Sequence, residues 1–109
     1  MANTFKNKTF DGSSTLANSD MIPYTAPSST TTVVIGLTVA NTSTAQITVD
    51  IKLDASTNIF LAKNLPIPAG SSFEYMSGNK IILQAGHSIK IQSDTANSAD
   101  TCLSIMEIT

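Results

Sequence analysis

The side chains that could carry out chemistry in this sequence are few and lie far apart. His87 is the only histidine and lies in the turn-like segment AGHS, and Cys102 is the only cysteine and lies in an apolar stretch. A general base or nucleophile needs partners within hydrogen-bond reach, and neither residue has a second histidine or a suitably spaced carboxylate beside it. We interpret His87 as a solvated turn residue and Cys102 as a small buried hydrophobic residue. We therefore expect no catalytic residue and no enzymatic activity.

Oxygen-bearing side chains alternate at Asp54, Ser56 and Asn58, as they do at the start of a calcium-binding loop. Such a loop also needs a glycine at its sharp turn and a glutamate at its end, and both are missing here. Other aspartates, such as Asp50 and Asp94, are scattered along the chain. A turn between two strands explains the pattern better, and we expect no metal and no other cofactor.

The composition restricts the partners that the chain could bind. Six lysines, no arginine and eight acidic residues give a net charge of −2 over 109 residues. Arginine is the residue best suited to bidentate phosphate recognition, so we expect no nucleic-acid partner. No apolar run approaches the roughly 20 residues that span a bilayer, so we expect no membrane insertion, and the amino end lacks the apolar core of a signal peptide. A single cysteine forms no internal disulfide, so stability must come from packing or from neighbouring chains.

The elements that would position these residues are short β-strands, predicted by alternating hydrophobic residues. Residues 33–39 form a nearly continuous β-branched run, which is typical of a central strand covered on both sides. Residues 46–53 alternate cleanly after the turn-rich link NTSTA, so the two strands are predicted to form a hairpin or meander. In the first strand, four side chains would point to the same side: Val33, Ile35, Leu37 and Val39. The second would direct inward Ile47, Val49, Ile51 and Leu53.

The second half of the chain continues this pattern. Residues 58–63 predict a short strand, and the prolines in 65–68 restrict that segment to a sheet edge or a connection, because proline cannot donate to a ladder. Glycine-containing turns then separate further predicted strands at 71–76, 80–83, 88–93 and 101–108, the first two joined as a tight hairpin through 77–79. Seven or so strands without a helical period predict an all-β fold, a single antiparallel β-sandwich that is Ig-like or jelly-roll-like.

The first part of the chain lacks such alternation. Residues 1–28 hold scattered apolar side chains among turn-forming residues, so we predict an extended arm there and a sandwich domain at 29–109. Either a strand of the arm docks on its own sheet or neighbouring chains hold it. Tyr24 could fill a pocket of its own chain or of a neighbour, because aromatic residues often anchor interfaces. The residues that we expect at an interface are Phe5, Phe10, Met21, Ile22 and Tyr24.

Five segments, in order, carry a resemblance to a known group of proteins. They are IPYTAPSSTTTVVIGLTVAN, ITVDIKL, LPIPAGSSFEY, NKIILQAGHSIKI and LSIMEI, and they extend over residues 22–108. In this succession the chain resembles small β-sandwich virion proteins of tailed bacteriophages, especially those of marine and cyanobacterial phages. Such proteins often carry aspartate in the turn where this chain has His87, so the resemblance assigns no role to that turn.

The resemblance implies a structural protein of the virion, synthesised in the cytoplasm of the bacterial host. The implied role is a capsid decoration or cement subunit that forms homo-oligomers or binds the major capsid protein. A neck, tail or baseplate-fibre subunit is the alternative within this class. A module that binds a host receptor or glycan is a further alternative, although Phe60, Phe73 and Tyr75 lie in predicted strands where core packing is their expected use.

Overall fold

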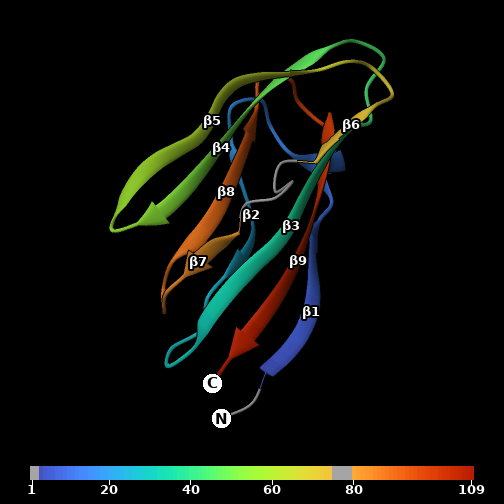
Figure 1. The fold of residues 1–109 in the computed structure, drawn as a ribbon. Helices are drawn as coiled ribbons and strands as arrows, with labels where there is room; N and C mark the ends of the chain where they lie inside the picture. Colours follow the sequence, from blue (N-terminus) through green and yellow to red (C-terminus); the bar gives the residue numbers. More distant parts are fainter. Residues whose placement is uncertain (1–2, 75–79) are drawn as a thin grey trace.

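The computed structural model describes residues 3–74 and 80–109, which form two antiparallel β-sheets packed against each other (Figure 1). The predicted all-β sandwich is therefore confirmed. The elements in chain order are β1 (Asn3–Phe10), the 3-10 helix η1 (Gly12–Ser14), β2 (Asp20–Thr25), β3 (Thr31–Asn41), β4 (Ile47–Ala55), β5 (Thr57–Ile67), β6 (Ser72–Glu74), β7 (Ile81–Leu83), β8 (Ser88–Ser93) and β9 (Ala99–Ile108).

The order of the strands identifies the type of sandwich. Sheet A has the order β1-β9-β3-β6, with β7 also paired to β3, and sheet B has the order β2-β8-β4-β5. The pairing is nested in sequence order, so that the first strand pairs with the last and the middle strands pair with each other. The pairs are β1 with β9, β2 with β8, β3 with β6 and β7, and β4 with β5. Strands β6 and β7 pair with successive stretches of β3 and together occupy one strand position. Eight strand positions in two sheets with this nested pairing are the jelly-roll arrangement, rather than the Ig-like one.

The core lies between the two sheets and follows the alternation of the strands. In β4, Ile47, Val49 and Ile51 are fully buried, as predicted, and Leu53 is partly buried. Each such side chain stabilises the fold by about 1.5–3 kcal/mol relative to an exposed position. Strands β8 and β9 contribute in the same way, with buried Ile89, Ile91, Leu103 and Ile105.

Strand β3 is central, as predicted, but its side chains alternate differently from the prediction. The register shifts between Val34 and Gly36, so Ile35 is an extra residue on this strand. A bulge of one residue exchanges the two sides of a strand beyond it. As a result Val34, Leu37 and Val39 are buried, whereas Val33 and Ile35 are only partly covered.

The link between β3 and β4 crosses from sheet A to sheet B, so the predicted hairpin of these two strands is wrong. Asn41, at the end of β3, is 3% exposed and holds this crossing. Its Nδ2 donates to the carbonyl oxygens of Ala45 and Ile67, both at 2.9 Å, and its Oδ1 accepts from the Ser43 N–H.

The proline-containing segment lies at a sheet edge, as predicted, because β5 is the edge strand of sheet B. The predicted strand at 58–63 and the segment at 65–67 form one continuous strand. Its hairpin with β4 turns at Ser56, at a φ of 77°. The predicted turn at 77–79 and Tyr75 lie outside the described residues. Within the described part, β6 and β7 pair with β3 and not as a hairpin of their own.

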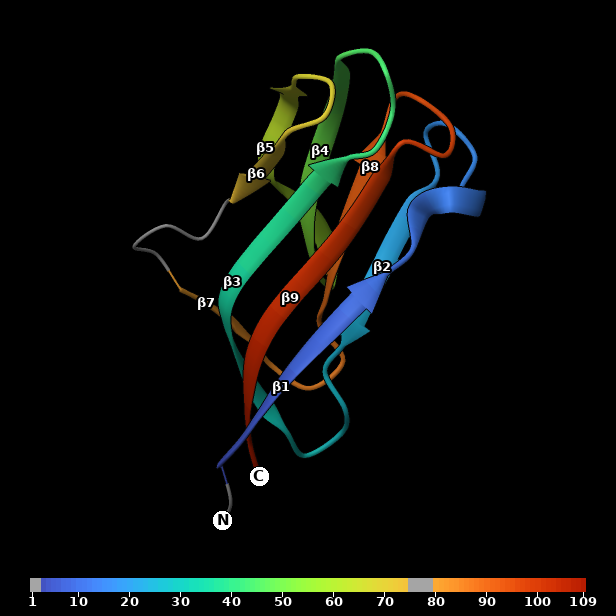
Figure 2. The same ribbon diagram turned by 90° about the vertical axis from the view of Figure 1, so that its right-hand side faces the viewer.

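The first 28 residues differ from the extended arm that we predicted. Strand β1 pairs with β9 over its whole length, and β2 pairs with β8, so both belong to the sandwich (Figure 2). A bulge between Met21 and Tyr24 places both side chains inward although they are three residues apart. Because this spacing does not alternate, the sequence pattern conceals a strand that contributes to the core. A boundary at residue 28 therefore separates no independent unit in the structure.

Candidate functional site

The outer face of sheet A displays small, uncharged and apolar side chains. Strand β9 buries alternate residues from Ala99 to Glu107, so Cys102, Ser104 and Met106 point away from the core. This face is presented to the viewer in Figure 2, where β3, β9 and β1 lie side by side. Within the strands of sheet A, the register directs two charged side chains to this face, Glu74 and Asp100, both beside the end of β3.

One row of apolar residues crosses four strands on this face. Phe5 lies opposite Met106, Met106 opposite Val33, and Val33 opposite Ile82. Phe5 is 71% exposed and Ile82 50% exposed, and the two inner members are partly covered. We call these four residues the apolar row. Directly opposed residues on one sheet face have neighbouring Cβ atoms, so the row is a continuous strip.

The same face is hollowed in two places. A hollow of about 330 Å³ lies next to the apolar row, and we call it the Phe5 hollow; it is lined by Phe5, Lys6, Asn7, Ile35, Ser104 and Ile105. A second hollow of about 310 Å³ lies farther along the strands, where Thr9, Thr38 and Cys102 are neighbours in the register. Both open to solvent on sheet A.

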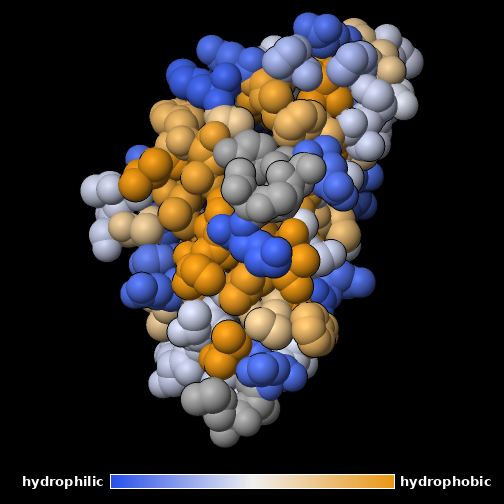
Figure 3. Space-filling view, in the orientation of Figure 1, coloured by the Kyte–Doolittle hydropathy of each residue, from blue (hydrophilic) through white to orange (hydrophobic). Residues whose placement is uncertain are grey.

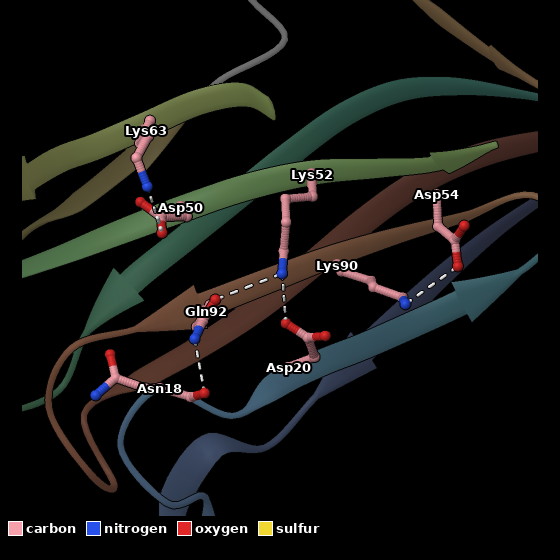
Figure 4. A network of polar contacts seen from close by, with 8 residues as sticks. All are labelled: Asn18, Asp20, Asp50, Lys52, Asp54, Lys63, Lys90 and Gln92. Carbon is pink, nitrogen blue, oxygen red and sulfur yellow. Dashed lines mark hydrogen bonds and ion pairs between the residues drawn. The ribbon is translucent and has the colours of Figure 1, made fainter. Parts of the chain in front are cut away.

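The outer face of sheet B has the opposite character. Three lysines of this face are paired with aspartates of the same chain: Lys52 with Asp20 at 2.9 Å, Lys90 with Asp54 at 3.1 Å, and Lys63 with Asp50 at 3.9 Å (Figure 4). Gln92 joins this network by accepting from Lys52 and donating to the Asn18 carbonyl. Because these lysines and aspartates neutralise one another, this face offers no unpaired lysine among the three to attract a charged partner.

Hydrophobic residues also gather at the side of the molecule where β5 and β7 lie. Figure 3 shows orange residues over much of this side, with a hydrophilic group among them and further hydrophilic residues toward the margins. The exposed large hydrophobic residues of these two strands lie on different faces: Ile82 is on the outer face of sheet A, Phe60 is on that of sheet B beside Lys52, and Ile59 precedes Phe60 on β5. The Lys63 ammonium lies 4.4 Å from the centre of the Phe60 ring, so Phe60 serves as a cation-π partner on sheet B and not as the core residue that we predicted.

A buried polar cluster joins the two sheets at one end. The Tyr24 hydroxyl on β2 donates to Glu107 Oε2 at 2.6 Å and lies 2.8 Å from Thr32 Oγ1. Glu107 Oε1 lies 2.8 Å from Lys6 Nζ on β1. Burial, followed by the bond to Glu107, raises the pKa of Tyr24 to about 12. Hydrogen bonds from Lys6 and then Tyr24 hold the pKa of Glu107 below its usual value. We call these four residues the Tyr24 cluster.

The five residues that we expected at an interface divide into two groups. Met21 and Tyr24 are buried in the chain's own core, and Phe10 packs against that core. Tyr24 therefore fills a pocket of its own chain. Phe5 and Ile22 remain exposed, at 71% and 42%. Of the two, Phe5 belongs to the apolar row on sheet A, whereas Ile22 lies on β2, an edge strand of sheet B.

The potentially reactive residues do not come together. Cys102 is exposed on the outer face of sheet A, so the prediction that it is buried is wrong; Leu103 and Ile105, on the other side of the strand, take the core positions. His87 lies in the turn before β8 of sheet B, partly covered, and its Nδ1 accepts from the Gln84 N–H at 3.3 Å. Asp54 and Asn58 face each other beside the turn at Ser56, as predicted.

Metal-binding clusters and membrane-spanning helices are both missing from the part of the chain that the structure describes. No group of three or more histidine, cysteine or acidic residues within 3–74 and 80–109 is placed to hold a metal ion. In the same part of the chain there is no helix of the length and apolarity needed to cross a bilayer.

Comparison with known proteins shows a likeness of fold to solved structures but no likeness in sequence. No protein-family model matches the chain, and no curated protein matches it in sequence. Its fold is similar to that of a chain from the acid-stable capsid structure of Helicobacter pylori bacteriophage KHP30, with a TM-score of 0.58 and 11% identity over 100% of this chain and 89% of that one. The likeness is one of fold.

Two further solved structures share the fold. A chain from Bacillus endospore appendages, described as a family of disulfide-linked pili, has a TM-score of 0.52 and 16% identity over 96% of this chain and 85% of that one. A chain from the IBDV viral particle has a TM-score of 0.55 and 9% identity over 96% of this chain but 30% of that one. These neighbours come from a capsid, a viral particle and a pilus.

Proposed function

We propose that this chain is a structural protein of a bacteriophage virion, and specifically a capsid decoration or cement subunit that stabilises the particle through contacts between subunits. The observation that carries the proposal is the full-length similarity of fold to a chain from a bacteriophage capsid structure. The resemblance of residues 22–108 to small virion proteins supports the same class independently of the coordinates.

The surface supports a role in assembly rather than in chemistry. The outer face of sheet A carries an apolar row and two hollows, and exposed apolar patches of this kind mark interaction surfaces. His87 and Cys102 lie on different sheets, so they form no catalytic pair. The proposal accordingly includes no enzymatic activity, cofactor, nucleic acid or membrane.

The alternative is a neck, tail or baseplate-fibre subunit, and the similarity to a pilus chain favours it, because that chain belongs to a filament. A jelly roll serves either role, since fold does not determine where on a particle a subunit lies. The two assignments differ in copy number, which is large for a protein covering a head and small for a neck or tail component.

The test is to locate and count the chain on purified virions. Gold-labelled antibody in negative-stain images should decorate the head, and quantitative mass spectrometry should give a copy number comparable to that of the major capsid protein. Label confined to the tail with a low copy number would establish the alternative. If the chain is missing from purified particles while it is present in infected cells, the proposed function is wrong.

A further inference from the structure

We propose that the outer face of sheet A is a self-association surface, on which Phe5 of each of two copies enters the Phe5 hollow of the other. This inference deepens the proposed assembly role and rests on it for its biological setting. Its physical basis is independent, because it uses only features of this face.

The two complementary features lie side by side on one chain. Phe5 is 71% exposed, more than Phe60 at 48%, and it also forms one wall of the Phe5 hollow. Cavities of about 150 Å³ accept a benzene ring, so a hollow of about 330 Å³ has room for a phenyl ring from outside. The entering ring would also contact the resident Phe5, and such aromatic pairs are favourable.

A protrusion and a matching hollow on one face fit a second copy better than an unrelated partner. In a two-fold dimer each contact occurs twice, because the same patch serves both subunits. If Phe5 of one copy fills the hollow of the other, symmetry therefore repeats the contact with the roles exchanged. No other residue is needed for the second contact. An unrelated partner would have to supply both features itself.

The charges of the face permit this arrangement. The apolar row has no charged member. Lys6, the one charged residue that lines the Phe5 hollow, is paired with Glu107 at 2.8 Å, so covering the row and the hollow leaves no unpaired charge. The two charged side chains that the strands direct to this face, Glu74 and Asp100, lie together toward the end of β3. In this dimer the two-fold axis would lie between the two faces, perpendicular to the strands, and pass between Ser104 and Met106. It would place the acidic ends of the two copies at opposite ends of the dimer, so that they do not repel each other.

The face is large enough for a stable contact. Strand β3, with 11 residues, is roughly 35 Å long, and the four strand positions of sheet A span roughly 20 Å, so the face measures on the order of 700 Å². This is comparable to the about 800 Å² per partner of a standard interface. Aromatic residues in the centre of an interface contribute a large part of its affinity. Phe5 and the adjoining apolar row would form that centre.

The test compares two matched substitutions in the full chain. Ile82→Asp and Ile59→Asp make the same change at residues of 50% and 52% exposure, the first in the apolar row and the second on β5 of sheet B. Sedimentation velocity over a range of protein concentrations should show wild-type and Ile59→Asp dimers. Ile82→Asp and Phe5→Asp should associate at least tenfold more weakly while circular dichroism shows folded proteins.

A second measurement locates the contact directly. In a Cys102→Ser background, Ser104→Cys places a thiol on the lining of the Phe5 hollow. Maleimide labelling of this thiol should become slower as the protein concentration rises, and the Phe5→Asp change should abolish that protection. Labelling independent of concentration would show that the hollow stays open and would overturn the proposal.

The remaining outcomes separate this inference from the proposed function. A wild-type chain that is monomeric at every concentration overturns the inference. If that chain is nevertheless found on virions, and Phe5→Asp prevents its incorporation, the face binds a different virion protein. A dimer that depends on Phe5, formed by a chain missing from virions, leaves the inference standing and removes the proposed function.

Discussion

Glu107 places a carboxylate on the inner side of sheet A, where burial alone would disfavour its charge. Lys6 and Tyr24 offset that cost by hydrogen-bonding its two oxygens. Because these bonds lower the pKa of Glu107 from its ordinary value of 4.5, they stabilise the folded state above that pH, and their contribution is lost as the pH falls through the lower, folded-state pKa.

Tyr24 makes the stability of the fold depend on pH in the opposite sense to Glu107, with a loss as the pH rises. Its pKa is about 12 in the folded state and 10.0 ordinarily, so the folded chain holds the phenol proton more tightly. Between about pH 10 and 12 the free energy of unfolding should therefore fall, by on the order of 1 to 2 kcal/mol. Urea unfolding at several pH values should show this fall in the wild type and a smaller one in Tyr24→Phe, which keeps every lysine. Equal slopes would mean that burial and the bond to Glu107 do not raise the pKa of Tyr24 in the folded chain.

Asn41 supports the crossing between the sheets. Asn41→Ala removes the donor to two carbonyl oxygens, of Ala45 and Ile67, and the second of these bonds is buried. A buried acceptor left without a partner costs about 1–3 kcal/mol, and we expect a loss of that size in urea unfolding. Thr44→Ala, in the exposed part of the same link, is the control and should change stability by less than about 0.5 kcal/mol. A similar loss in both variants would assign the effect to the link as a whole.

At the scale of elements, β1 and β2 decide whether the sandwich can form. A chain that begins at Ser29 would lack Met21, Tyr24 and Ala26 from the core and would leave β8 and β9 without a neighbour on one side. We expect it not to fold, with no cooperative thermal transition by circular dichroism. At concentrations where the wild type is monomeric, Phe5→Ala, which removes an exposed side chain of β1, should melt like the wild type. If the truncated chain is folded and soluble, the predicted division into an arm at 1–28 and a sandwich domain at 29–109 would be supported after all.

The sequence predicted the elements whose side chains alternate without interruption. Strand β4 has this pattern, and its inward residues Ile47, Val49 and Ile51 are where they were expected. Strands β2 and β3 contain bulges, and a single inserted residue changes the side on which later side chains lie. No local pattern marks such an insertion, so the core role of Met21 and Tyr24 was missed.

The candidate site was harder to predict than the fold, because it is assembled from separate strands. The apolar row takes one residue from each of β1, β9, β3 and β7, and only the register brings them together. Phe5 was predicted to be an interface residue because of its place in an arm, whereas the structure places it on β1 in the apolar row. Cys102 could have been assigned to the outer face from the alternation with Leu103 and Ile105.

At the scale of the whole molecule, the charged face of sheet B should contribute little to stability. Its ion pairs are at the surface, where such a pair is worth about 0–1 kcal/mol and is weakened by salt. Raising sodium chloride from low to molar concentration should therefore change the free energy of unfolding by less than about 2 kcal/mol. Urea unfolding in the two conditions checks this, with Lys52→Met as the control for the pair at 2.9 Å. A larger decrease would show that the pairs act as a network.

The nested pairing has a consequence for how the chain reaches this structure. Strand β1 pairs with β9, so residues at the two ends, such as Asn3 and Ile108, must find each other across nearly the whole sequence. Among the strands of residues 3–74 and 80–109, the β4–β5 hairpin is the only pairing of two consecutive strands. Such non-local topologies fold in milliseconds to seconds rather than microseconds. On the ribosome, sheet A has to wait for the emergence of β9, and until then the earlier strands keep open edges that other nascent chains could pair with.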